Sequence, residues 1–91
     1  MKVRFTARAQ AELLAQTDWL TERSPEAARR ASRAIREKLS RLADFPLAAP
    51  AIDAVHRDAA VRFGRDGLFV RYRIVGEVLV VVRVFHGRQD R

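Results

Sequence analysis

Hydrophobic and polar residues alternate at the start of the chain, and their spacing then changes to that of a helix. Val3 and Phe5 alternate with basic residues, a pattern that is typical of a half-buried strand. Thr6 can accept a hydrogen bond from a free backbone N–H and so begin a helix. From Ala7 to about Glu22, apolar residues recur at steps of three and four, which predicts a helix with one buried face.

A second helix is predicted directly after the first. Ser24, Pro25 and Glu26 supply a capping hydroxyl, a residue suited to the first helical position, and an acid near the positive end of the helix dipole. Small and aliphatic residues then recur at helical spacing to about Ala43. The short connection predicts an antiparallel helical hairpin. We expect Trp19 of the first helix to pack in the core or between the helices.

The rest of the chain predicts a loop followed by strands. Two prolines make the segment after the second helix a loop, and Asp58 to Phe63 is expected to form a short strand. Leu68 to Val75 and Val78 to His86 are rich in β-branched and aromatic residues, and the two residues between them, Gly76-Glu77, suit a type II′ hairpin turn. The chain is therefore predicted to be a single α+β domain over residues 1–91, with an N-terminal strand, an antiparallel two-helix hairpin and a C-terminal antiparallel β-meander forming a small sheet.

The pairing of the hairpin predicts which side chains share a face of the sheet. If Val75 faces Val78, partners along the two strands lie on the same side. One face, expected to cover the helices, collects Leu68, Val70, Tyr72, Ile74, Leu79, Val81, Arg83 and Phe85. The other face collects Phe69, Arg71, Arg73, Val75, Val78, Val80, Val82, Val84 and His86. A row of valines in water is unfavourable, so the second face predicts an obligate or near-obligate partner.

Composition and charge restrict the kind of partner. Eighteen Lys and Arg residues against 11 Asp and Glu residues give a formal charge of +7, which attracts nucleic acid or an acidic protein and leaves both open. Basic residues crowd the outer side of the second helix, where Glu26 with Arg30, and Glu37 with Arg33 and Arg41, have the spacing of ion pairs. That spacing predicts a solvated face with weak ion pairs.

Several classes of site and location are not expected. The chain has no Cys, which excludes a disulfide scaffold, a thiolate nucleophile and a cysteine metal cage. His56 and His86 lack the spacing of metal ligands, and the glycines do not form a phosphate-binding fingerprint, so neither a metal nor a cofactor is expected. The longest apolar stretch, Val78 to Val82, is far too short to span a membrane, and the N-terminus lacks the apolar core of a signal peptide. We therefore expect a soluble, cytoplasmic protein.

Short motifs in a fixed order along the chain resemble the ParE branch of the ParE/RelE toxin superfamily. They are Val3-Arg4-Phe5-Thr6, Ser24-Pro25-Glu26-Ala27-Ala28, Leu42 to Pro46, Phe63-Gly64-Arg65, Arg71-Tyr72-Arg73 and the tail His86-Gly87-Arg88. The resemblance implies the toxin of a type II toxin–antitoxin pair that inhibits DNA gyrase. It also implies a hetero-oligomer with an acidic ParD-like antitoxin. A RelE-like toxin, which cleaves messenger RNA at the ribosome without a metal, is the alternative.

The face pattern and the resemblance together give the candidate site residues. The candidate antitoxin-binding residues are Phe69, Arg71, Arg73, Val80, Val82 and Val84. The candidate target-binding residues are Arg62, Arg65, His86 and Arg88, and a nuclease would use Arg83, His86 and Arg88. In a nuclease, arginines would hold phosphates and His86 would act as general acid or base. No Lys lies in the C-terminal half and no Tyr follows Tyr72, which favours the gyrase inhibitor over the nuclease.

Overall fold

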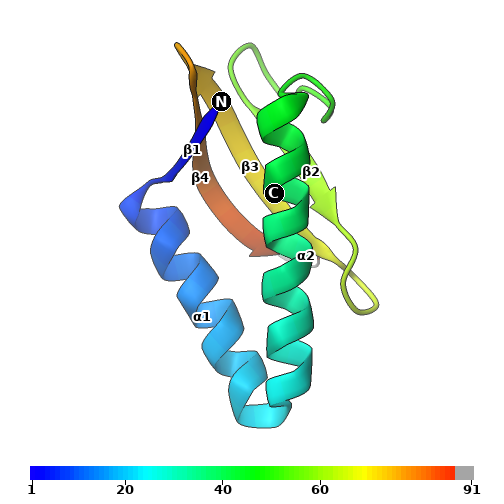
Figure 1. Ribbon diagram of the computed structural model, residues 1–91. Coiled ribbons are helices and arrows are strands. Elements are labelled where there is room, and N and C mark those ends of the chain that lie inside the picture. Colours follow the sequence, from blue (N-terminus) through cyan, green and yellow to red (C-terminus); the bar gives the residue numbers. More distant parts are fainter. Residues whose placement is uncertain (88–91) are drawn as a thin grey trace.

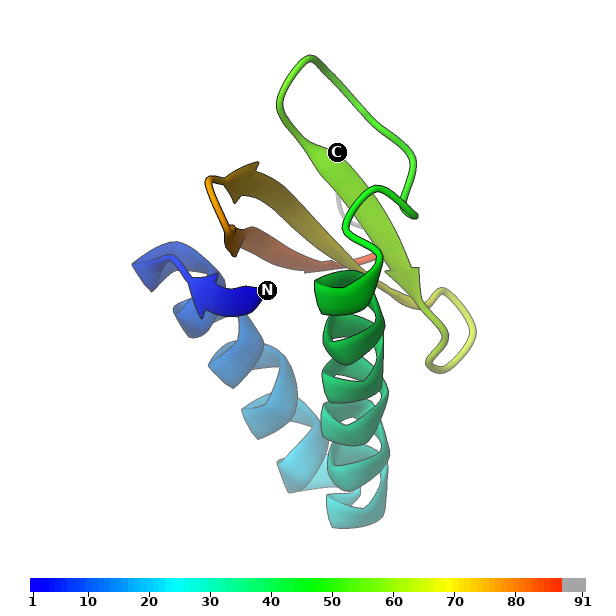
Figure 2. The same ribbon diagram turned by 45° about the horizontal axis from the view of Figure 1, so that its top comes forward.

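The protein has two layers, a four-stranded sheet and a helical hairpin that covers one of its faces (Figure 1). The computed structural model describes residues 1–87. Its elements are β1 (Lys2–Phe5), α1 (Ala7–Arg23), α2 (Pro25–Asp44), β2 (Arg57–Val61), β3 (Leu68–Val75) and β4 (Val78–His86). The strand order is β1-β4-β3-β2, with β1 parallel to β4 and the other pairs antiparallel. Both helices lie on the same side of the sheet (Figure 2), and the expected α+β class is confirmed.

Side-chain caps start both helices where the sequence predicts them. The Thr6 hydroxyl accepts a hydrogen bond from the Ala9 amide at 3.1 Å, and the Ser24 hydroxyl accepts one from the Ala27 amide at 3.1 Å. The backbone N–H of Ser24 also donates to the Leu20 carbonyl, so this single residue closes α1 and opens α2. One connecting residue forces the helices to turn back on each other as the predicted hairpin.

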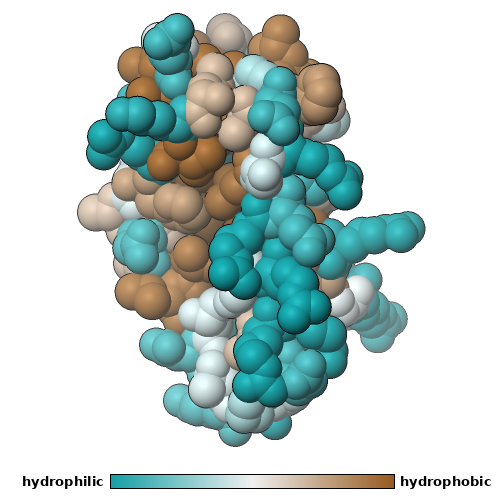
Figure 3. Space-filling model, in the orientation of Figure 1, coloured by the Kyte–Doolittle hydropathy of each residue, from teal (hydrophilic) through white to brown (hydrophobic). Residues whose placement is uncertain are grey.

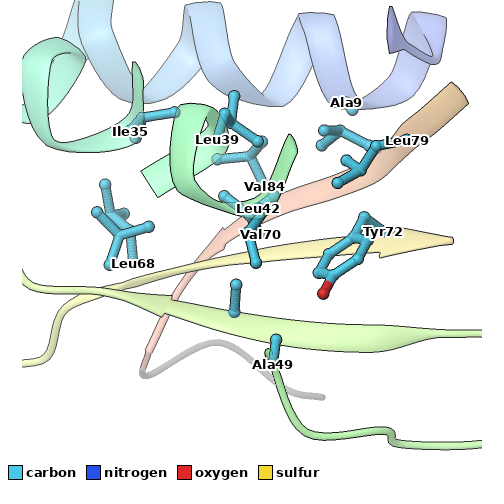
Figure 4. Packing of buried hydrophobic residues seen from close by; sticks show 13 residues of the cluster. Ala9, Ile35, Leu39, Leu42, Ala49, Leu68, Val70, Tyr72, Leu79 and Val84 are labelled. Atoms are coloured by element: carbon cyan, nitrogen blue, oxygen red, sulfur yellow. The ribbon is translucent and has the colours of Figure 1, made fainter. Parts of the chain in front are cut away.

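The core lies between the hairpin and the sheet. The predicted apolar stripe of α2 is buried over its whole length, at Ala28, Ala31, Ile35, Leu39 and Leu42. Ile35 and Leu39 point toward the sheet, where residues such as Val70 and Val84 complete the cluster (Figure 4). Tyr72 is fully buried there, and its hydroxyl donates to the Pro46 carbonyl at 2.6 Å. Burial raises the pKa of this phenol, so Tyr72 serves the core as a neutral donor.

The expectation that Trp19 packs in the core is wrong. Its side chain is 55% exposed, and the Arg23 guanidinium carbon lies 3.9 Å from the ring centroid. The reason is visible in Figure 1, because the end of the hairpin where α1 meets α2 projects beyond the sheet. A residue near that end has no strand beneath it, and a cation–π contact takes the place of core packing.

The β3–β4 hairpin has the predicted limits, and its turn has the predicted conformation. Gly76 has φ +59°, and no described residue other than glycine has a positive φ, which matches the pattern of signs in a type II′ turn. β2 ends earlier than expected, at Val61 instead of Phe63, and begins one residue sooner because Arg57 pairs with Tyr72 of β3.

The predicted hairpin register is correct near the turn and wrong beyond it. Pairing follows the prediction from Val75 with Val78 to Tyr72 with Val81, but a β-bulge then leaves Val82 as an extra residue on β4. An extra residue reverses the direction of every later side chain on its strand. Four assignments to faces are therefore corrected. Val84 and His86 belong to the helix-covered side of the sheet, and Arg83 and Phe85 belong to the other side.

Candidate functional site

The face of the sheet that no helix covers, here called the open face, carries an apolar centre with a basic rim. Strand pairing puts its residues in rows across the sheet. The two rows nearest the hairpin turn are Lys2, Val78 and Val75, and then Arg4, Val80 and Arg73. We call these six residues the valine patch. Val75 is 49% exposed, Arg4 and Arg73 are exposed, and the other two valines are half-buried. These rows contain no acid, so the patch combines apolar surface with positive charge.

The third row of the open face is an ion pair within the chain. Arg71 and Asp58 are partners across β3 and β2, and the Arg71 Nε and Nη2 atoms donate to the two Asp58 carboxylate oxygens at 2.8 and 3.1 Å. This hydrogen bonding raises the pKa of Arg71 above the ordinary arginine value. Asp58 is buried. The candidate antitoxin contact Arg71 therefore already has a carboxylate partner in the isolated chain.

The same row ends in a second internal ion pair, on β4. Arg83 donates from Nη2 to Oε2 of Glu12 on α1 at 2.8 Å, and the backbone amide of Val84 donates to Glu12 Oε1 at 3.0 Å. The contact is possible because β1 ends at Phe5, which leaves this edge of β4 without a neighbouring strand. Burial by itself raises the pKa of Glu12, but hydrogen bonds from Arg83 and Val84 outweigh it and lower the pKa.

The two arginines of this row enclose an aromatic ring. The Arg71 and Arg83 guanidinium carbons lie 5.2 and 5.1 Å from the centroid of Phe85, and Phe69 stacks on the same ring with centroids 5.7 Å apart. Phe85 is fully buried, although it lies on the face that no helix covers. Sequence reasoning missed this cluster, because strict alternation along β4 places Phe85 under the helices.

The remaining candidates for antitoxin contact differ in exposure. Phe69 and Val82 are half-buried on or beside the open face, with Val82 at the bulge. Val84 is 1% exposed and belongs to the core cluster beneath the helices, so the assignment of Val84 to the partner face is wrong. The bulge is the physical reason, since it turns this side chain inward.

The three target-binding candidates among the described residues lie at the end of the sheet opposite the hairpin turn. Arg62 and Arg65 are exposed and line one hollow of about 570 Å³ under the β2–β3 connection. The Gly87 amide donates to the Gly67 carbonyl at 3.0 Å, which holds the end of β4 beside this connection. His86 precedes that contact and is half-buried. Arg88 lies outside the described residues.

Arg83 and His86, the two nuclease candidates among the described residues, are not brought together. Arg83 points to the open face and pairs with Glu12, whereas His86 is the register partner of the buried Leu68 on the helix-covered side. Within residues 1–87, no group of three His, Cys, Asp or Glu side chains could hold a metal ion. None of the helices described is long and apolar enough to cross a membrane.

A second apolar surface lies between the helices, where sequence reasoning predicted none. It is a hollow of about 410 Å³ lined by Phe5, Leu13, Leu14, Ile35 and Leu39, with three polar residues at its edge. Hydrophobic side chains are seen between the helices in Figure 3. Leu14 is 52% exposed at this hollow. The sequence signal for this surface was the position of Leu14 next to Leu13, which widens the apolar stripe of α1.

Comparison with known proteins identifies the fold and the family. Residues 3–91 match the family described as ParE toxin of type II toxin–antitoxin system, parDE. Toxin RelE1 of Caulobacter vibrioides is 32% identical over 73 residues, which cover 80% of this chain and 78% of that protein. A chain of the chromosomal ParDE toxin–antitoxin system from P. aeruginosa has the same fold, with a TM-score of 0.71 and 23% identity over 94% of this chain and 95% of that chain. The chain therefore belongs to the ParE family of toxins of type II toxin–antitoxin systems.

Proposed function

We propose that this toxin inhibits DNA gyrase, and that an acidic ParD-like antitoxin neutralises it by covering the valine patch. The family match over residues 3–91 supports the toxin and its antitoxin partner. The separation of Arg83 from His86 by the sheet is the observation that favours gyrase inhibition over RNA cleavage.

RNA cleavage requires a group that activates the 2′-hydroxyl, a group that protonates the leaving oxygen, and cations near the developing charge. In this chain the candidate histidine and Arg83 lie on opposite sides of the sheet, and Arg83 is neutralised by Glu12. Tyr72 cannot replace the histidine, because its phenol is fully buried and bonded to the Pro46 carbonyl. The candidate residues Arg83 and His86 thus do not form an assembled acid–base pair.

Ribosome-dependent cleavage of messenger RNA is the second candidate function. The observation in its favour is the name of the relative from Caulobacter vibrioides, Toxin RelE1, which is 32% identical to this chain. A nuclease of this type would need no metal, and residues 1–87 contain no group of three His, Cys, Asp or Glu side chains that could hold one. Gyrase inhibition involves no chemistry by the toxin itself and needs only a surface that binds the enzyme.

A direct comparison of the two targets tests the proposal. Purified toxin is added to gyrase with relaxed plasmid, and separately to ribosomes carrying a defined message; the complex of toxin with its antitoxin is the control in both assays. We expect supercoiling to fall with added toxin, the complex to leave it unchanged, and the message to stay intact. Cleaved message together with undiminished supercoiling would establish the nuclease instead.

The valine patch suits an antitoxin segment in which acidic and apolar residues alternate. Such a segment covers Val75, Val78 and Val80 with its apolar side chains and pairs its acids with Arg4 and Arg73, and it orders as it binds. Valine surface that water contacts in the free chain is then buried in the complex, which supplies the hydrophobic part of the binding energy.

Two matched variants locate the antitoxin. Val75 and Leu14 are about equally exposed, at 49% and 52%, but lie on opposite layers, so Val75→Asp and Leu14→Asp place the same charge in the two apolar surfaces. We expect Val75→Asp to weaken antitoxin binding by about tenfold or more in a calorimetric titration, and Leu14→Asp to change it little. A greater weakening with Leu14→Asp would move the antitoxin to the hollow between the helices.

A further inference from the structure

The outer side of α2 carries more uncompensated positive charge than the sequence predicts. Six basic residues occur between positions 29 and 41, with Glu37 as the single acid among them. The expected pairs of Glu37 with Arg33 and Arg41, and of Glu26 with Arg30, do not form within 4.0 Å. Glu26 pairs instead with Arg29, at 2.6 Å. The expectation of a face laced with ion pairs is therefore wrong, and most of its cations have no carboxylate partner among residues 1–87.

Three of these arginines share a hollow with hydroxyl groups. Arg29, Arg33 and Arg36 line a space of about 370 Å³ between the helices, together with Thr17, Thr21 and Ser32. The lining residues include no acid, and of the three arginines only Arg29 has a carboxylate partner among residues 1–87, which is Glu26. Guanidinium groups bind phosphate oxygens bidentately, and Ser and Thr hydroxyls add neutral donors, which is the usual composition of a contact with a nucleic-acid backbone.

The spacing along α2 fits a regular row of phosphates. Arg29 and Arg36 are seven residues apart, or roughly 10 Å along the helix axis. One strand of duplex DNA presents a phosphate about every 3.4 Å along its axis, so this row spans about three phosphates. Hydrophilic side chains form a continuous band over α2 in Figure 3. The hollow has no aromatic lining on which unpaired bases could stack, which favours a duplex over a single strand.

We propose that the α2 arginines Arg29, Arg33 and Arg36, called here the arginine row, bind the phosphate backbone of duplex DNA without reading its sequence. The choice of DNA over duplex RNA rests on the proposed function, because gyrase acts on duplex DNA. The arginine row and the valine patch lie on opposite layers of the molecule, so one chain can present both at once.

Fluorescence anisotropy with a labelled 20-base-pair duplex of arbitrary sequence tests the proposal. The triple variant Arg29→Gln, Arg33→Gln, Arg36→Gln is compared with the control Lys2→Gln, Arg4→Gln, Arg73→Gln, which removes the same number of positive charges from the valine patch. All six side chains are exposed, and far-UV circular dichroism checks that both variants fold. Affinity is measured across a salt series for each protein, on DNA and on duplex RNA of equivalent sequence.

We expect the arginine-row variant to bind DNA more weakly than the control and to show a shallower plot of log affinity against log salt, by about 0.9 for each phosphate that the variant no longer neutralises. Equal weakening in the two variants would overturn the proposal, because net charge alone would then explain binding. Tighter binding to duplex RNA would overturn the assignment to DNA. These measurements contain no gyrase, so a failure here is distinct from a failure of gyrase inhibition in the supercoiling assay.

Discussion

Removing the Glu12 carboxylate should destabilise the fold out of proportion to its place on the surface of α1. This side chain joins α1 to β4 by accepting from Arg83 and from the Val84 amide, at the point where β1 has ended and the edge of β4 is open. In Glu12→Ala the Arg83 guanidinium is left without its partner, and the Val84 amide is left without its acceptor in a partly buried setting. No nearby strand can replace either hydrogen bond, because β1 has ended.

The size of the effect follows from burial. The Glu12 and Arg83 side chains are 21% and 20% exposed, so the pair is neither fully solvated nor fully dry. Each hydrogen bond to a charged group contributes about 1.5–3 kcal/mol, and Glu12 accepts from two partners. Water recovers part of that sum at this exposure, so we expect Glu12→Ala to cost about 2–3 kcal/mol. For a domain of this size each kcal/mol lowers Tm by roughly 4–8 °C, which makes the fall in Tm on the order of 10–20 °C.

Denaturant unfolding at pH 7 followed by circular dichroism measures the effect, and Glu26→Ala is the control. Glu26 makes the shorter ion pair, 2.6 Å to Arg29, but both side chains of this pair are well exposed. We expect the control to unfold at the same denaturant midpoint as the parent chain. If Glu12→Ala lost no more stability than Glu26→Ala, the contacts of Glu12 with β4 would contribute nothing to the free energy of unfolding. The reasoning from burial would then be wrong.

Three further outcomes are expected. Because the pKa of Glu12 is lowered in the folded state, its stabilisation is complete above the ordinary glutamate pKa and disappears as the pH falls through the lowered value. The difference in unfolding free energy between the parent chain and Glu12→Gln should therefore shrink in a pH series below about pH 4.3, and a constant difference would contradict this. Gly87→Ala should lower Tm in a thermal melt, since the added methyl group collides with the Asp66 carbonyl oxygen, and an unchanged Tm would show that the connection yields freely. Arg73→Glu should weaken antitoxin binding by about tenfold or more and Arg33→Glu should not, whereas equal weakening in a titration would reject the valine patch as the antitoxin site.

The elements that depend on neighbours in the sequence were predictable. The caps at Thr6 and Ser24 use hydroxyls within three residues of the amides they satisfy, and the hairpin turn at Gly76 needs only a positive φ at one position. The buried stripe of α2 follows from helical periodicity alone. Trp19 was not predictable in this way, because its exposure depends on how far the hairpin extends past the sheet.

The candidate site was predictable only as far as the bulge. Alternation from the turn correctly places Val75, Val78, Val80 and Arg73 on the open face. Beyond Val81 the faces follow from the bulge at Val82, and Glu12 binds β4 directly after it, 71 positions away along the chain. No pattern local to β4 signals the bulge.

The position of the register shift also decides which arginines are available to a partner. Near the turn, Arg4 and Arg73 are exposed, and no carboxylate of residues 1–87 pairs with them, so they can pair with an acidic segment. Past the bulge, Arg71 and Arg83 are neutralised by Asp58 and Glu12 and enclose Phe85, so they stabilise the sheet and contribute little net charge to binding. The chain's excess of basic residues therefore acts from two separate places, the rim of the valine patch and the outer side of α2, which suits a protein that meets an acidic partner on one layer and a polyanion on the other.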